Sequence, residues 1–391
     1  MSYPRNKLGD YIEVLSGFAF KSKDFSDSGV PVIKIKNISP PVVTLEDVSY
    51  VPESIAFQNA RYILKKGDVL IALTGSHINQ IASVVGRVGR VRYDETSVLN
   101  QRVGKIINKD DRVSNLDFIY YYLSQFDVKV ELAQKAGGAA NQANISPSDI
   151  KDLHFPCPPI EIQNKIAEML SRYDALIENY QRQIKLLEEA AQRLYKEWFV
   201  DLRFPGHQST PIINNLPQAW QKKKLGEIAE FKRGKTITKK EIIEGDVPVV
   251  AGGLEPAYYC NKSNTDKRVV TVSGSGANAG FTRMYFEKVW ASDCSFVDCS
   301  STRYLHFVYC YLIANKTSID NMQKGAAQPH VYAKDINAMD ILVPPCNLLD
   351  SFEHEASKLF DVIASRNNQI RNLSEARDRL LPKLMNAEID V

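Results

Sequence analysis

The chain has 391 residues, of which 44% are hydrophobic and 24% charged, a composition typical of a folded protein with two or three domains. It lacks an apolar run of about 18 residues, and its first residues form no apolar signal segment, so we expect no membrane partner and a cytoplasmic location. Its six cysteines form no C-x-x-C pair and match no histidine spacing, which argues against a zinc site.

The net charge of +3 is unevenly distributed along the chain. Residues 1–157 and 201–345 carry +2 and +4, whereas residues 158–200 and 346–391 carry −1 and −2. Two mildly basic blocks therefore alternate with two mildly acidic segments, which is compatible with two nucleic-acid-binding bodies on a neutral frame.

Both basic blocks have the pattern of α+β domains. Runs rich in β-branched residues and closed by polar or glycine turns predict short strands at 30–38, 67–76, 247–252 and 268–276. Strongly apolar segments predict a pair of matching buried helices, at 116–126 and 304–314.

Both acidic segments have the pattern of long helices. From Ile166 to Trp198, every position in a 4-3 spacing is apolar, which predicts a heptad seam. The second seam, from Phe352 to Leu380, contains Arg366 and Arg377, and we expect Pro382 to end or kink that helix. The simplest arrangement is an intramolecular antiparallel coiled coil; the alternative is that each helix packs only on its own block.

The two halves are copies of one unit. A shift of 217 aligns residues 7–33 with 224–250 at nine identities in 27 positions, and a shift of 186 aligns 149–194 with 335–380 at 13 in 46. The segments between these registers differ in length and sequence. The unit thus has a shared framework and a variable middle, and we place its boundaries at 1–157, 158–200, 201–345 and 346–391.

No enzymatic motif is complete. The segment "AEFKRGKT" at 229–236 has Ala229 where a phosphate-binding loop needs glycine. Gly274, Gly276 and Gly280 only partly match a dinucleotide-binding pattern. We therefore expect a non-catalytic chain with no cofactor and no metal of its own.

Polar and basic residues follow the predicted strands in each block. Such side chains can hydrogen-bond base edges, while scattered lysines and arginines hold phosphates; the alternative is that these are ordinary solvated loops. The candidate DNA-binding residues are Lys34, Lys36, Asn37, Thr74, Ser76, His77, Asn79 and Arg102 in the first block, and Lys232, Arg233, Lys235, Ser273, Ser275, Asn278 and Arg283 in the second.

The whole chain resembles the specificity subunits of type I restriction-modification systems. The likeness lies in the "KLGD" and "KLGE" openings, the "PPIEIQNKIA" helix entry, "RLYKEWFVDLRFPGH" with "LPQAWQKKKLGEI", and the C-terminal "LSEARDRLLPKLMNAEIDV". Two places depart from the family pattern: Ala387 stands where glycine is usual, and "PPCNLLDSF" lacks the usual Glu-Gln pair.

The resemblance implies two target recognition domains separated by a long antiparallel coiled coil, each reading half of a bipartite asymmetric site in double-stranded DNA. It also implies that the helices dock two methyltransferase subunits, which in turn can recruit restriction subunits. S-adenosylmethionine, ATP and Mg²⁺ are then expected in these partners, which would methylate adenine and cleave DNA. The alternatives are a recognition subunit of another phage-defence system, an orphan specificity subunit and, less favoured, a nucleotide-dependent enzyme.

Overall fold

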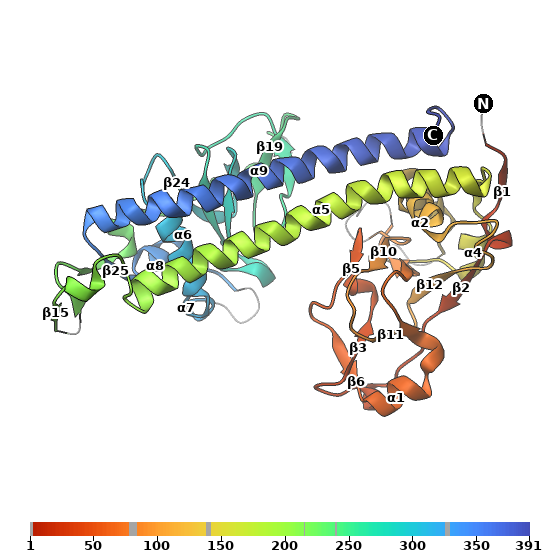
Figure 1. The fold of residues 1–391 in the computed structure, drawn as a ribbon, viewed down its shortest axis with the longest axis horizontal. Helices are drawn as coiled ribbons and strands as arrows, with labels where there is room; N and C mark the ends of the chain where they lie inside the picture. The colour runs from red at the N-terminus through yellow and green to blue at the C-terminus, as the bar shows by residue number, and fades with distance from the viewer. Residues whose placement is uncertain (1–2, 78–83, 138–141, 215, 239–240, 325–328) are drawn as a thin grey trace. The chain divides into compact units, whose positions relative to one another are not determined.

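The computed structural model describes residues 3–77, 84–137, 142–214, 216–238, 241–324 and 329–391. Its contacts divide the chain into two compact units, residues 1–177 with 371–391 and residues 178–370 (Figure 1). Each unit is α+β, as predicted, and contains a part of two long helices, α5 (Ile160–Tyr195) and α9 (Cys346–Met385). The division therefore falls inside both helices, whereas the domain boundaries predicted from the sequence lie close to the helix ends.

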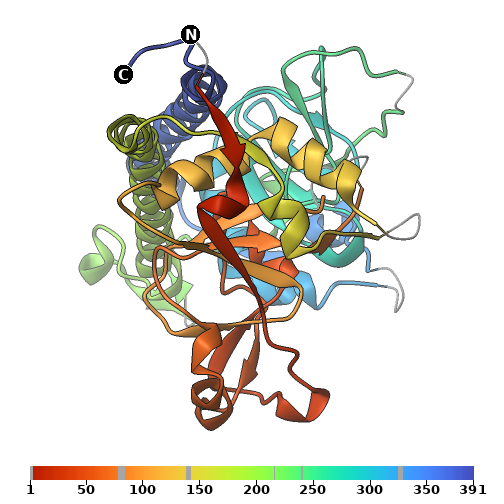
Figure 2. The same cartoon turned by 90° about the vertical axis from the view of Figure 1, so that its right-hand side faces the viewer.

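The first unit is built on two small mixed sheets, drawn in red to orange in Figure 2. One has the strand order β2–β12–β8–β10–β5–β4, with β2 at Ile12–Ser16, β4 at Ile38–Ser39, β5 at Val42–Val43, β8 at Val69–Ala72, β10 at Val88–Val91 and β12 at Val103–Asn108. The other has the order β6–β3–β11–β7, with β3 at Val30–Ile33, β6 at Ser49–Val51, β7 at Ile63–Leu64 and β11 at Ser97–Leu99. The predicted strands at 30–38 and 67–76 are thus confirmed.

The other described strands of this unit form two short pairs: β1 (Arg5–Lys7) with β14 (His154–Pro156), and β9 (Thr74–Gly75) with β13 (Ala143–Asn144). The helices are α1 (Glu53–Gln58), α2 (Leu116–Ser124), α3 (Phe126–Lys135) and α4 (Pro147–Lys151). Helix α2 begins where the Asn115 side chain accepts hydrogen bonds from the first free backbone N–H groups. It buries Phe118 and Tyr122 against Phe155, so it fills the core as predicted.

The second unit repeats this plan. One sheet has the order β18–β24–β21–β22, with β18 at Lys232–Arg233, β21 at Val269–Ser273, β22 at Thr282–Tyr285 and β24 at Cys294–Asp298. Another has the order β20–β19–β23, with β19 at Val247–Val250, β20 at Tyr258–Cys260 and β23 at Trp290–Ala291. The other described strands form the pairs β17 (Gln221–Lys224) with β25 (Asp340–Val343) and β15 (Ile212–Ile213) with β16 (Leu216–Pro217). The α-helices described between these strands are α6 (Leu305–Ala314), α7 (Lys316–Asp320) and α8 (Ala333–Asn337).

Backbone hydrogen bonds confirm the internal repeat residue by residue. Leu8 N donates to Leu153 O at 2.8 Å, and Leu225 N donates to Met339 O at 2.8 Å. The residue numbers of the two donors differ by 217 and those of the two acceptors by 186, which are the two shifts found in the sequence. Gly17 and Gly234 also correspond, and a Cβ atom on either would come within 2.4 Å of a backbone oxygen, at 2.1 Å and 2.3 Å. Only glycine allows this close approach, which explains why both copies have it.

The long helices pack both on their own units and on each other. In the first unit Ile166 and Leu170 are fully buried, and in the second Ala191 is. Arg377 of α9 donates to Asp174 of α5 at 2.7 Å in the first unit, and Arg366 donates to Gln183 at 2.8 Å in the second. The predicted antiparallel pairing of the two helices is therefore present within each unit. The helices also pack on the sheets and helices of these units, which was the alternative arrangement.

Of the two outcomes expected at Pro382, an end or a kink of the helix, the first is wrong because α9 does not end there. The helix continues through Pro382 to Met385, because Leu384 and Met385 are buried in the core of the first unit and hold the last turn in place. Proline inside a helix removes one backbone donor and crowds the preceding turn, which costs about 3 kcal/mol, and the burial of these two side chains offsets that cost. Just beyond, Ala387 has a φ of +56°, the left-handed conformation that glycine adopts most easily.

Candidate nucleic-acid interface

Three strand ends meet at one edge of the first unit. Ile33, the last residue of β3, accepts a backbone hydrogen bond from Asn100 at 3.1 Å, and Leu73, just after β8, donates one to Arg102 O at 3.0 Å. The turn between β11 and β12 therefore joins the loop that begins at Lys34 to the loop that begins at Thr74. Candidates that lie far apart in the sequence share one edge of the sheets.

The loop after β3 is shaped by its own polar side chains. Asn37 is 1% exposed; its Oδ1 accepts from Lys34 N at 3.0 Å and its Nδ2 donates to Glu46 O at 2.9 Å. These bonds end β3 and form a tight turn, since an asparagine side chain competes well with the sheet for backbone groups. Lys34 Nζ donates to Ser49 Oγ at 2.8 Å, and Lys36 pairs with Asp47, whose pKa this hydrogen bond lowers.

The described part of the loop after β8, residues 73–77, is mostly buried. Thr74 and Ser76 are 5% and 9% exposed, and Thr74 Oγ1 donates to Asn144 Oδ1 at 2.7 Å. His77 is half-buried and Arg102 is exposed, while Asn79 lies outside the described residues. Of the candidates in this unit, Lys36 and Arg102 are therefore the exposed cations, and Asn37, Thr74 and Ser76 hold the loops in shape. Their contacts with DNA stay predictions.

The corresponding edge of the second unit is built by the same backbone bonds. Ser292 N donates to Val250 O at 2.8 Å, matching Asn100 N to Ile33 O, and Gly274 N donates to Asp293 O at 3.0 Å, matching Leu73 N to Arg102 O. The segment that begins at Ser273 therefore occupies the place of the segment that begins at Ala72 in the first unit.

The candidates of this second edge differ in how far their side chains are already engaged. Ser275 Oγ donates to the Asp293 carboxylate, Asn278 Nδ2 donates to Gly252 O at 3.4 Å, and Arg283 donates to Leu254 O at 2.8 Å. Ser273 is buried, and its hydroxyl has no hydrogen-bond partner among the described residues. The exposed cations are those of β18 and the residue after Gly234, namely Lys232, Arg233 and Lys235.

A hollow of about 280 Å³ opens at this edge and contains residues that sequence reasoning missed. Arg233, Asp293 and His330 line it, together with Tyr332, whose ring stacks on that of His330 at 5.9 Å between centroids. The internal repeat could have identified one of them. His330 lies 186 positions after Asn144, the residue whose side chain accepts a hydrogen bond from Thr74 at the first edge.

The part of the helix pair in the first unit contains a buried ion pair. Asp174 is 4% exposed, and its carboxylate accepts from Arg377 Nη1 and from Tyr121 Oη, each at 2.7 Å. Burial lowers the pKa of Arg377, but its hydrogen bonds and charge interactions with Asp174 and Asp378 outweigh this, so the net pKa is raised. Burial and the Asp174 charge raise the pKa of Tyr121, which stays a neutral donor.

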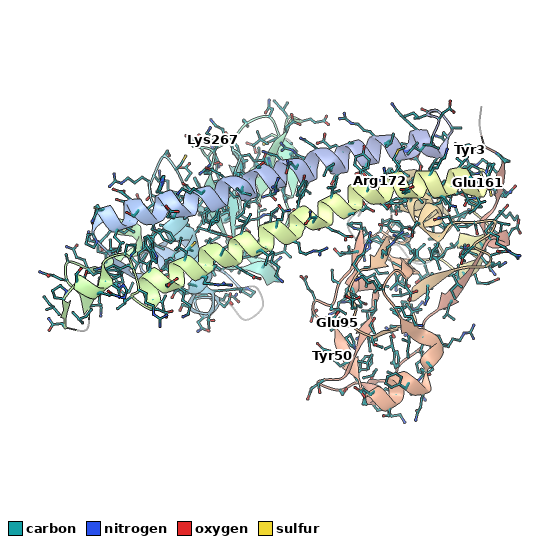
Figure 3. All side chains as sticks on the ribbon, viewed as in Figure 1. Tyr3, Tyr50, Glu95, Glu161, Arg172 and Lys267 are labelled. Carbon is teal, nitrogen blue, oxygen red and sulfur yellow. The ribbon has the colours of Figure 1, made fainter. Side chains whose placement is uncertain are left out.

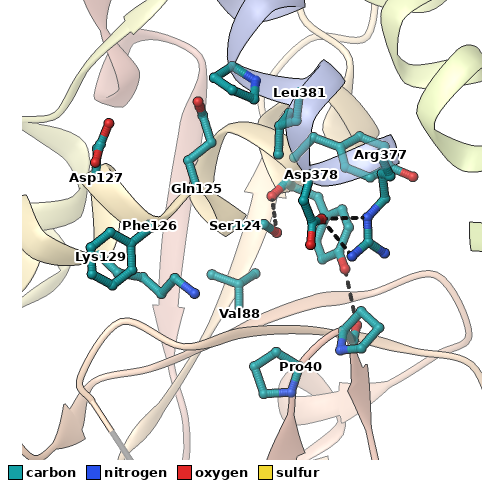
Figure 4. A pocket seen from close by; sticks show the side chains of 14 residues that line it. Pro40, Val88, Ser124, Gln125, Phe126, Asp127, Lys129, Arg377, Asp378 and Leu381 are labelled. Atoms are coloured by element: carbon teal, nitrogen blue, oxygen red, sulfur yellow. Dashed lines mark hydrogen bonds and ion pairs between the residues drawn. The ribbon is translucent and has the colours of Figure 1, made fainter. Parts of the chain in front are cut away.

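Arg377 also borders a hollow of about 410 Å³ in the first unit. Figure 4 shows it with Asp378 on α9, and with Pro40, Val88 and Lys129 in the same lining. Burial lowers the pKa of the Lys129 ammonium.

On the outer surface of α5, Glu161 and Arg172 are exposed to solvent (Figure 3).

Two further features of the described residues bear on function. None of their helices is both long enough and apolar enough to span a membrane. Nor do three or more His, Cys, Asp or Glu side chains come together among them as metal ligands would.

Comparisons with known proteins agree with this architecture. A sequence model described as "Type I restriction modification DNA specificity domain" matches residues 5–189 and 217–372. The type I restriction enzyme MjaIX specificity subunit of Methanocaldococcus jannaschii is 28% identical over 414 residues, covering 98% of this chain and 93% of that protein. The putative MjaX specificity subunit of the same organism is 24% identical over 401 residues, with 98% and 93% covered.

A solved structure shows the same fold: the S subunit of a type I restriction-modification system from M. genitalium has a TM-score of 0.58 at 18% identity, with 100% of this chain and 97% of that chain covered. The duplicated fold, with an equivalent loop-built edge in each unit, defines a binding protein made of two similar halves. The chain belongs to the family of type I restriction modification DNA specificity domains. It is a DNA-recognition subunit of a type I restriction-modification system.

Proposed function

We propose that each unit reads one half of a bipartite, asymmetric DNA site through the edge where its strand ends meet. One observation carries this proposal: the two edges share their backbone hydrogen bonds but not their exposed side chains. Equal backbones place the loops in the same way, and unequal side chains offer different donors and acceptors to base edges. A protein with two such DNA-binding units has one recognition surface for each half-site.

The charge distribution supports contact with DNA at both blocks. Lys232, Arg233 and Lys235 are exposed beside the second edge, and Lys36 and Arg102 are exposed at the first. Lysine and arginine at such positions neutralise phosphates and release counterions, a contribution that is independent of sequence. Specificity then comes from the few side chains that reach base edges.

We propose that catalysis resides in partner subunits. Ala229 supports this, because it is buried and its backbone N–H closes a tight turn on Leu225 O at 2.9 Å. The segment 229–236 contains the strand β18 at its centre, and among the described residues no helix starts directly after it, so it lacks the loop-to-helix backbone that cradles phosphates. S-adenosylmethionine, ATP and Mg²⁺ are then bound by methyltransferase and restriction subunits.

The long helices are the proposed docking surface for two methyltransferase subunits. Leu176 and Leu186 on α5 and Val362 on α9 are 44%, 62% and 40% exposed, although each lies in a helix that otherwise buries its apolar face. Exposed apolar side chains can take part in protein contacts, and these three are the positions on the long helices where we expect the partner subunits to bind.

A selection experiment tests the function of the full chain. The purified chain, alone and with its co-expressed methyltransferase subunits, is mixed with a library of randomised DNA duplexes, and the retained molecules are sequenced. We expect two short specified blocks at a constant separation. A single specified block, or two copies of the same block, would contradict the assignment of one half-site to each unit.

A further inference from the structure

The two edges carry opposite hydrogen-bonding groups at one equivalent position. Arg102 O accepts from Leu73 N, and Asp293 O accepts from Gly274 N, each at 3.0 Å. The next residues, Val103 and Cys294, are equivalent too, since their carbonyl groups accept from Gly17 and Gly234 at 3.0 Å and 2.8 Å. Arg102 in the first unit and Asp293 in the second are therefore structurally equivalent, although the sequences around them do not align.

The Asp293 carboxylate is exposed and held in place. It accepts a hydrogen bond from Ser275 Oγ, and it lines the 280 Å³ hollow beside Arg233 and His330. A Cβ atom on Gly274 would lie 3.1 Å from Asp293 Oδ1, whereas the equivalent residue in the first unit is the buried Leu73. The second unit thus leaves space beside the carboxylate.

A carboxylate at this place is unfavourable for binding the DNA backbone. It repels phosphates, and the side chain that donates a hydrogen bond to it, Ser275, is neutral and does not cancel its charge. The cations Lys232, Arg233 and Lys235 are exposed at the same edge, so this edge attracts DNA while Asp293 opposes close phosphates. An anion becomes favourable there if it accepts a hydrogen bond from an amino group of a base.

We propose that Asp293 accepts a hydrogen bond from the N4 amino group of cytosine in one half-site, and that Arg102 donates to O6 and N7 of guanine in the other. Aspartate and glutamate accept from cytosine N4, whereas arginine is the usual reader of guanine. One backbone position, used twice, thereby selects opposite members of the G·C pair. This inference rests on the proposed function, because it requires that the edges face base pairs.

The test is a selection from randomised duplexes with the full chain and its variants. D293N replaces the acceptor with an amide that pairs well with adenine, so we expect about tenfold loss of preference for cytosine at one base pair and a shift towards adenine there. R102Q should relax a guanine in the other half-site. D293E, which keeps the carboxylate, should retain the cytosine preference.

The matched control is D266N, which removes the same charge from an exposed aspartate that precedes β21, at the end of that strand away from the hollow. Circular dichroism and thermal melting verify that each variant is folded. If folded D293N selects the wild-type bases unchanged, or if D293N and R102Q alter the same half-site, the inference is overturned. If the wild-type chain selects no sequence at all, the proposed function fails instead.

Discussion

The buried pair between Asp174 and Arg377 allows a sharp test of what holds the helix pair to the first unit. Replacing Asp174 with leucine leaves Arg377 and the Tyr121 hydroxyl without their acceptor in a site that is 4% exposed. Breaking a buried ion pair on one side costs about 3–5 kcal/mol, and we expect the lower end of this range here because Arg377 keeps its contact with the exposed Asp378. The unit contains about 200 residues, for which this loss lowers the unfolding midpoint by roughly 10 °C.

The second unit shows that the same place can be built without charges. The repeat-equivalents of Asp174 and Arg377 are Phe360 and Ala191, which are buried and belong to one apolar cluster. We therefore expect the triple variant D174L/R377M/Y121F, which removes Asp174 together with both of its hydrogen-bond donors, to recover most of the stability. Arg92, whose guanidinium lies 4.0 Å from the Asp174 carboxylate, is one-third exposed and can turn to solvent. Replacing a complete buried pair by apolar residues is often neutral or stabilising.

Calorimetric and urea unfolding of the full chain measure these changes. The matched control is D378N, since Asp378 also pairs with Arg377, at 2.8 Å, but its side chain is 63% exposed. We expect D378N to change the free energy of unfolding by less than about 1 kcal/mol. The reasoning is refuted if D174L unfolds like the wild type, or if the triple variant is as unstable as D174L.

Two further changes test the framework. Four residues inserted after Asn179 in α5 and four after Asn367 in α9 lengthen both helices by about 6 Å and rotate their ends by only about 40°. If the helices set the separation of the half-sites, selected duplexes should gain one or two unspecified base pairs at about 3.4 Å each, and an unchanged spacing in a folded variant would exclude this role. Separately, A387G should raise the free energy of unfolding by about 1 kcal/mol, because Ala387 has a φ of +56°; equal stability in urea titration would show that the turn bears no strain.

The framework of this fold could be predicted from the sequence because it is written twice. The alignment of the two halves at a fixed shift pairs Gly17 with Gly234. In the structure a backbone oxygen lies so close to each of them that no side chain would fit. The heptad spacing also found both helices, since apolar periodicity directly reflects burial. The error at Pro382 arose because local propensity was weighed without the burial of Leu384 and Met385.

The side-chain roles at the two edges were harder to predict. Asn37 has the same chemistry as a base-reading asparagine, but it is engaged by Glu46 O and by the backbone of Lys34. Whether a polar side chain such as Asn37 forms its hydrogen bonds within the protein depends on which distant loop folds over it. Asp293 was missed for the converse reason, because its equivalence to Arg102 appears only in backbone hydrogen bonds.

The central claim, one half-site for each unit, is tested most directly by mapping methylated adenines after exchanging one block. Residues 10–155 are replaced with the corresponding block of a relative that has a different site, and the hybrid is expressed with the methyltransferase subunits of this chain. Long-read sequencing of the host DNA then gives the modified motif. The account predicts that one specified half changes while the other half stays as in the wild type. A folded hybrid whose motif changes in both halves, or in neither, would contradict it.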